Sequence, residues 1–90
     1  MMGHKREVQI TNKRGLHARA SAKFVTLASG LPCEIIVEKD GQSVTGTSIM
    51  GLMMLGAAMG DSIVISAAGD QAMHAVEQLA LLVENRFGEE

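Results

Sequence analysis

The chain has 90 residues, of which 47% are hydrophobic and 20% charged, and its formal net charge at pH 7 is -2. This length suits one small domain, and the composition is that of an ordinary globular protein. The weak negative charge and the lack of Trp and Tyr argue against nucleic-acid or anionic-membrane partners, which require basic patches or stacking rings.

The cysteine content and the apolar runs bear on the cellular compartment. Cys33 is the single cysteine, which is typical of a reducing cytosol, and we expect it to act as a small core hydrophobe. Lys5 and Arg6 are followed by no apolar stretch, so the N-terminal segment does not resemble a signal peptide. The longest apolar run, residues 49–59, is too short to span a bilayer. We therefore expect one cytoplasmic domain over residues 1–90.

The first quarter of the chain predicts a strand and a helix. Val8 and Ile10 alternate with polar residues, as in a strand with one wet face. A polar loop at residues 12–15 precedes a helix expected over residues 18–29, which Gly30 and Pro32 end. The spacing of the small and apolar residues predicts that this helix buries Ser21, Phe24, Val25 and Ala28.

A β-hairpin is expected next. Residues 33–38 alternate in the manner of a strand, and a short return strand is expected over residues 42–45. Asp40 and Gly41 lie between them, and this pair is a strong hairpin signal because a primed turn needs positive φ.

The remainder predicts a short helix, a strand and a final helix. The short helix is expected over residues 48–55, with Thr47 or Ser48 as its N-cap. A strand follows at residues 62–67, and Asp70 is expected to cap the last helix. The apolar stripe of that helix is predicted to contain Met73, Val76, Leu79, Ala80, Val83 and Phe87.

The predicted order of elements is therefore β-α-β-β-α-β-α. Strands with one apolar face, mixed with helices, predict an α+β fold in which helices cover one side of a sheet. We find no internal repeat, linker or low-complexity segment. Many unrelated functions share such layouts, so the fold class alone predicts no activity.

Residues 15–19, Gly-Leu-His-Ala-Arg, place His17 where the loop meets the first helix. Helix N-termini offer unpaired N–H groups and a partial positive charge, so a phosphoryl group on this imidazole would meet donors already in place. Arg19 adds a planar guanidinium suited to phosphate, at a position where the helix dipole disfavours a cation. From these residues alone, a histidine that merely precedes a helix is an equal alternative.

The short helix has more apolar residues than one buried face can hold. Leu52 and Leu55 are expected in the core. The surplus indicates an exposed patch for protein partners, because methionine adapts to several of them. The surplus residues are Ile49, Met50, Met53 and Met54.

The other histidines carry no comparable signal. His4 is expected in a frayed end, and His74 lies off the apolar stripe of the last helix. No spacing of His, Cys or carboxylates resembles a metal site, and no P-loop or dinucleotide-binding glycine pattern occurs. We expect neither a metal nor a cofactor.

Two motifs resemble those of the HPr family, the histidine-containing phosphocarriers of the bacterial phosphotransferase system. Residues 15–19 match the active-site signature, and residues 48–56, Ser-Ile-Met-Gly-Leu-Met-Met-Leu-Gly, match the signature around a regulatory serine. The resemblance runs from about Glu7 to Val83. It implies an open-faced β-sandwich with a four-stranded antiparallel sheet and three helices on one face.

The resemblance also implies a phosphocarrier that is not itself an enzyme. His17 would accept a phosphoryl group on Nδ1 from enzyme I, which is charged by phosphoenolpyruvate, and pass it to an enzyme IIA domain, with Arg19 assisting. Ser48 would be the target of HPr kinase/phosphorylase where that kinase exists. We expect a monomer that serves either the sugar-transport or the nitrogen-related branch. Its partner surface would comprise Ala20, Lys23, Ile49, Met50, Met53 and Met54.

One residue departs from the family pattern, in which proline usually follows the arginine. Ala20 stands there, and without the fixed φ of proline we expect a looser first turn with intact chemistry. The N–H of Ala20 is a candidate further phosphate donor. Two alternatives stay open: a purely regulatory binding module that acts through Ser48 and the Met50 and Met53 surface, and an unrelated α+β interaction domain.

Overall fold

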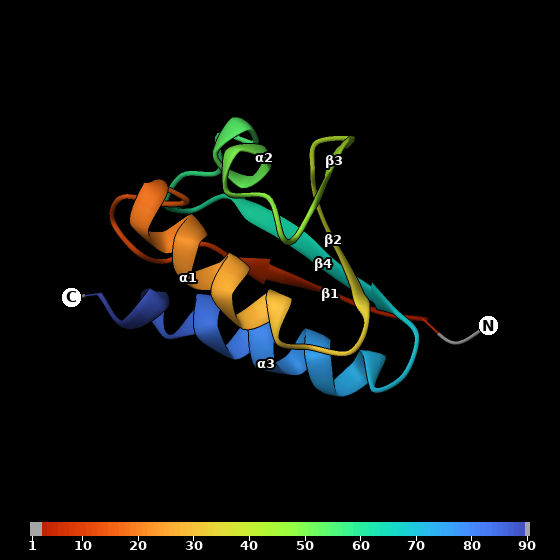
Figure 1. Ribbon diagram of the computed structural model, residues 1–90. Helices are drawn as coiled ribbons and strands as arrows, with labels where there is room; N and C mark the ends of the chain where they lie inside the picture. The colour runs from red at the N-terminus through yellow and green to blue at the C-terminus, as the bar shows by residue number, and fades with distance from the viewer. Residues whose placement is uncertain (1–2, 90) are drawn as a thin grey trace.

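The computed structural model describes residues 3–89. It has one four-stranded antiparallel sheet of order β1-β4-β2-β3, with helices packed on one face (Figure 1). The expected open-faced sandwich is confirmed. The elements are β1 (Gly3–Gln9), α1 (Ala18–Ser29), β2 (Glu34–Lys39), β3 (Gln42–Thr45), α2 (Ile49–Met54), β4 (Ser62–Ala68), α3 (Ala72–Glu84) and the 3-10 turn η1 (Arg86–Gly88).

The hairpin between β2 and β3 has the predicted two-residue turn. Lys39 pairs with Gln42, and both Asp40 and Gly41 have positive φ, of 50° and 84°. These are the dihedral signs of a primed turn, whose twist matches that of the flanking strands. β4 then enters the sheet between β1 and β2, which brings the end of β1 beside the start of β4.

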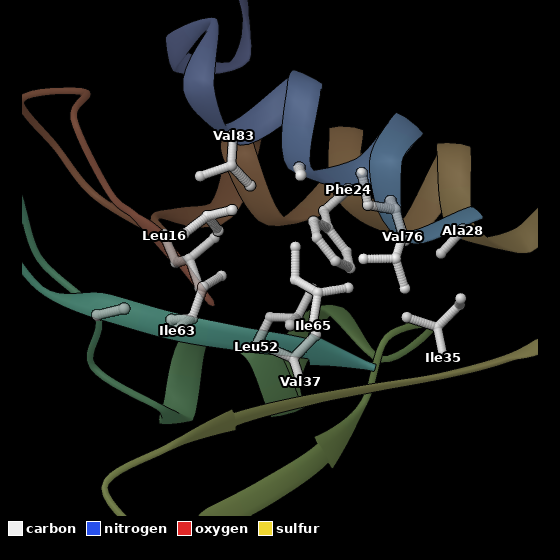
Figure 2. Close-up of a cluster of buried hydrophobic side chains, with 14 of the residues drawn as sticks. Leu16, Phe24, Ala28, Ile35, Val37, Leu52, Ile63, Ile65, Val76 and Val83 are labelled. Carbon is white, nitrogen blue, oxygen red and sulfur yellow. The ribbon is translucent and has the colours of Figure 1, made fainter. Parts of the chain in front are cut away.

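The core lies between the sheet and the two long helices (Figure 2). Phe24 of α1 is fully buried and points toward the sheet near Ile65 of β4 and Val76 of α3. Ser21 and Ala28 are buried on the same helix face, whereas Val25 is half-buried at its edge. Burial of side chains as large as Phe24 stabilises the fold by about 1.5–3 kcal/mol each.

The start of β1 and the start of β2 differ slightly from expectation. β1 begins at Gly3, so His4 is a half-buried strand residue and not part of a frayed end. Its Nε2 lies 3.9 Å from Oε2 of Glu77. Cys33 lies one residue before β2 and packs against the core while half-buried. Strand pairing extends to the first described residue because β4 is long enough to pair with it.

The start of α3 contradicts two predictions. The N-cap position is Gln71, with a left-handed φ of 61° and no side-chain cap hydrogen bond, so Asp70 does not cap this helix. Met73 is 62% exposed, because the first turn of α3 borders an open hollow lined by Gly3 and Gly69. The buried stripe instead begins with Ala72 and Ala75 and continues, as predicted, through Val76, Leu79, Ala80 and Val83.

Phe87 is buried as predicted, but it does not belong to the last helix. α3 ends at Glu84, and Phe87 lies in η1 with a positive φ of 55°. The chain therefore turns back after α3 toward the beginning of α1. Lys23 of α1 stabilises this reversal of the chain, since its Nζ donates a hydrogen bond to the Phe87 carbonyl at 2.7 Å.

Candidate functional site

The loop between β1 and α1 is held rigidly by its neighbours. The buried Asn12 donates from Nδ2 to the carbonyl of Gly15 at 2.9 Å. Gly15 has a φ of 65°, and a Cβ there would lie 2.3 Å from the carbonyl oxygen of Ala57, so only glycine fits. The N–H of Leu16 donates to the same carbonyl at 3.0 Å. The residue that follows Leu16 is thus presented in a fixed place.

His17 is that residue, and it is the N-cap of α1. Its Nδ1 accepts a hydrogen bond from the N–H of Arg19 at 3.3 Å, and its carbonyl accepts from the N–H of Ser21 at 2.9 Å. The side chain is 14% exposed. The imidazole therefore lies at the helix end that carries partial positive charge and N–H groups without intrahelical partners. This is the predicted position.

A carboxylate that sequence reasoning missed contacts the same ring. Glu89 Oε2 lies 2.6 Å from Nε2 of His17, and Glu89 Oε1 accepts from Asn12 Nδ2 at 3.0 Å. Desolvation raises the pKa of Glu89. The hydrogen bonds from Asn12 and His17, with the attraction of His17 and Lys23, outweigh it and hold that pKa below its ordinary value. Glu89 is 72 positions from His17, and no local pattern links the two.

Arg19 and Ala20 follow in the first turn of α1 and differ sharply in exposure. Arg19 is exposed, and within residues 3–89 no ion pair engages its guanidinium. Ala20 is fully buried because it faces the core one turn before Phe24. The expectation that Ala20 contacts partners is therefore wrong. Its N–H as a further phosphate donor stays a prediction. Lys23 is exposed, as predicted.

The helix α2 shows both of its predicted faces. Leu52 and Leu55 are buried, whereas Met50 and Met54 are 68% and 76% exposed. We call the exposed residues the α2 patch: Ile49, Met50, Met53 and Met54. α2 packs against α1, and the carbonyl of Ala57, three residues after the end of the α2 patch, accepts a hydrogen bond from the N–H of Leu16, the residue before His17.

Ser48 is the N-cap of α2, in agreement with the prediction. Its Oγ accepts a hydrogen bond from the N–H of Gly51 at 2.9 Å, and the residue is half-buried. Removal of such a cap costs about 0.5–2 kcal/mol. The hydroxyl thus has a structural role whatever else it does.

Neither a metal site nor a membrane-spanning helix is found among residues 3–89. Across residues 3–89, no group of three or more His, Cys, Asp or Glu side chains is arranged to hold a metal ion. None of the helices in that part of the chain is both long and apolar enough to cross a membrane.

Comparison with known proteins identifies the family. The family profile described as the PTS HPr component phosphorylation site matches residues 4–85. The chain belongs to the HPr family. The HPr-family phosphocarrier "Phosphocarrier protein HPr" of Cupriavidus necator is 42% identical over 84 residues, which cover 93% of this chain and 94% of that protein. "Phosphocarrier protein NPr" of Shewanella violacea is 38% identical and covers 93% and 92%.

A solved HPr structure agrees with this assignment. The structure named HPr-C-His from Thermoanaerobacter tengcongensis has a TM-score of 0.92 and 45% identity, and the match covers 97% of this chain and 98% of that one. The protein is thus an HPr-type phosphocarrier of the phosphotransferase system and not a catalyst. The alternative of an unrelated α+β interaction domain is excluded.

Proposed function

We propose that this protein accepts a phosphoryl group on Nδ1 of His17 from phosphorylated enzyme I and donates it to an enzyme IIA domain. The observation that carries the proposal is the position of His17 as the N-cap of α1. Nδ1 faces the helix start, 3.3 Å from the N–H of Arg19. A phosphoryl group on Nδ1 therefore lies next to N–H donors and the positive end of the helix dipole.

The transfer needs a nucleophile and a place for the phosphate charge. The lone pair of Nδ1 attacks phosphorus, the bond between phosphorus and the donor atom of enzyme I breaks, and its electron pair returns to that donor atom. The exposed guanidinium of Arg19 is free to pair with the phosphate oxygens. The same geometry serves the second transfer, in which a nucleophile of the enzyme IIA domain attacks the phosphorus and the electron pair of the N–P bond returns to Nδ1.

The α2 patch supports docking on both partners. Its side chains are apolar and exposed. The segment just after the patch contacts the loop before His17, since the carbonyl of Ala57 accepts a hydrogen bond from the N–H of Leu16. Methionines adapt to partners of different shape. Because the carrier must bind a donor and then an acceptor, the patch must be free between encounters, which favours a monomer. The unpaired thiol of Cys33 supports placement in the reducing cytoplasm.

We also propose that phosphorylation of Ser48 by a kinase of the HPr kinase/phosphorylase type regulates docking. Ser48 directly precedes Ile49 and Met50 of the α2 patch. A phosphate at the N-terminus of α2 is tolerated electrostatically, but its charge beside the patch opposes desolvation. Ser48→Asp should weaken the binding of enzyme I in a titration. Unchanged binding of both Ser48→Asp and kinase-phosphorylated protein would contradict this form of control.

The central experiment follows labelled phosphate from phosphoenolpyruvate. The protein is mixed with enzyme I of the sugar-transport branch or of the nitrogen-related branch, and the faster donor identifies the branch. The label should be confined to His17, lost in acid and retained in base, as expected of a phosphoramidate. His17→Ala should abolish labelling, whereas His74→Ala, which changes an exposed histidine of α3, should leave it intact.

The possible results separate the candidate functions. Label on the His17→Ala protein would refute the assignment of the phosphoacceptor. Absence of label on the unaltered protein with both enzymes I would favour the purely regulatory module. Label that cannot be passed to any enzyme IIA domain would refute the second half of the proposed relay.

A further inference from the structure

The carboxylate of Glu89 forms a contact that the proposed transfer does not itself require. Its Oε2 lies 2.6 Å from Nε2 of His17, on the side of the ring opposite Nδ1. Glu89 and His17 are both largely shielded, with side chains 19% and 14% exposed. A short contact between shielded groups is much stronger than the same contact in water.

Contacts of Asn12 and of the preceding tail residues hold Glu89 in place. Asn12 Nδ2 donates to Glu89 Oε1 at 3.0 Å and to the carbonyl of Gly15 at 2.9 Å, which uses both of its hydrogens. Two residues earlier in the tail, Phe87 is buried, and its carbonyl accepts from Lys23. The tail is therefore fastened to the core, to α1 and to the loop before His17.

Within residues 3–89, Asn12 has a buried oxygen without a hydrogen-bond partner, and its contacts explain why. Its Oδ1 is buried and has no hydrogen-bond partner among the described residues. An unpaired buried oxygen is unfavourable, yet a flipped amide would point that oxygen at two other acceptors, Gly15 O and Glu89 Oε1. The amide orientation is therefore fixed by its two hydrogen bonds, to the Gly15 carbonyl and to the Glu89 carboxylate, and this orientation leaves Oδ1 unpaired within the described part of the chain.

We propose that Glu89 is a positioning residue for phosphotransfer, because its carboxylate at Nε2 acts together with the longer hydrogen bond from the N–H of Arg19 at Nδ1 to hold His17 in the Nε2–H tautomer, which makes Nδ1 the nucleophile. This inference rests on the proposed role of His17. An ionised carboxylate only accepts hydrogen bonds, so the nitrogen that faces it must carry the hydrogen. The opposite tautomer would set the lone pair of Nε2 against the carboxylate oxygen.

The role of Glu89 can be followed through the reaction. As the N–P bond forms at Nδ1 and the bond to the donor atom breaks, the hydrogen on Nε2 stays in place. The phosphorylated ring then carries a positive charge, which the carboxylate faces directly at Nε2. When the phosphoryl group leaves, the electron pair of the N–P bond returns to Nδ1, and the ring recovers the same tautomer.

Glu89→Gln tests this role with little change in shape. The Gln oxygen can still accept from Asn12, which directs the Gln NH₂ group toward Nε2 of His17. An NH₂ donor at that point favours the opposite tautomer, with the hydrogen on Nδ1. Nitrogen-15 NMR in alkaline buffer, where histidine rings are uncharged, should show the unprotonated nitrogen at Nδ1 in the unaltered protein and at Nε2 in Glu89→Gln.

The second readout is the rate of phosphorylation by phosphoramidate, a small donor that needs no docking surface. We expect Glu89→Gln to slow labelling of His17 by about tenfold or more, because replacing the carboxylate that orients a reactive histidine by its amide favours the wrong tautomer. Glu34→Gln is the matched control. Glu34 is exposed and pairs with Ala68 at the end of β4, far from the start of β4 near His17.

The outcomes distinguish the two levels of the proposal. An unchanged tautomer or an unchanged labelling rate in Glu89→Gln, with His17 labelled normally in the unaltered protein, overturns the role of Glu89 alone. Failure of the unaltered protein to be labelled by phosphoramidate and by enzyme I overturns the proposed function of His17, and this inference with it. A tautomer switch together with slower labelling supports both.

Discussion

A single charge on the exposed face of α2 should separate docking from folding. Met50→Glu places a carboxylate in the middle of the α2 patch, where the Met50 side chain is 68% exposed. Leu52 lies two residues further along the same short helix and is fully buried. Leu52→Ala is therefore a comparison on the same helix with the opposite environment.

The expected magnitudes follow from these environments. A substitution on an exposed surface changes the free energy of unfolding by no more than about 0.5 kcal/mol. Truncation of a buried leucine costs about 2–5 kcal/mol, and each kcal/mol lowers Tm by about 4–8 °C in a domain of this size. Met50→Glu should therefore shift Tm by only a few degrees, whereas Leu52→Ala should lower it by roughly ten degrees or more.

Two measurements on each variant complete the test. Thermal melts give Tm, and a titration with enzyme I gives Kd at a temperature where both variants are folded. Met50→Glu should bind at least about tenfold more weakly, because docking would have to desolvate a carboxylate in an apolar contact. Met50→Glu with a large loss of Tm would show that Met50 supports the fold. Unchanged Tm with unchanged Kd would place the docking surface elsewhere.

Three further predictions concern the loop, the first helical turn and the tail. Gly15→Ala should destabilise the protein by more than about 1 kcal/mol in denaturant melts, because its φ of 65° and its approach to Ala57 exclude a Cβ; a stability equal to that of the unaltered protein would contradict the described loop. Arg19→Ala should slow phosphotransfer and leave Tm unchanged, since the exposed guanidinium has no ion pair within residues 3–89; equal transfer rates would remove Arg19 from the site. The lowered pKa of Glu89 means that its carboxylate stabilises the fold above its ordinary value of 4.5 and that this contribution is lost as pH falls below that value. The Tm difference between the unaltered protein and Glu89→Gln should therefore shrink in acid, and a difference independent of pH would argue against the contact.

The sequence by itself determined the features that depend on residues close together in the chain. Alternating apolar residues predicted the strands, and the Asp40-Gly41 pair predicted the hairpin, since only a few residues tolerate positive φ. The position of His17 at the start of α1 followed from a polar loop that runs into a helical pattern. The two faces of α2 followed from a count of apolar residues too large for one buried stripe. Each of these inferences depends on residues within a few positions of one another.

The tertiary structure decided the features that depend on which distant segments meet. Ala20 is buried because the packing of α1 turns that side of its first turn toward the core. Met73 is exposed because, within residues 3–89, nothing covers that side of the first turn of α3. The reversal at Phe87 uses a left-handed φ that its residue type does not predict. That reversal brings Glu89 to His17 across 72 positions of sequence. A hydrogen bond between such distant residues arises only when the whole chain is packed, so no local pattern could have predicted it.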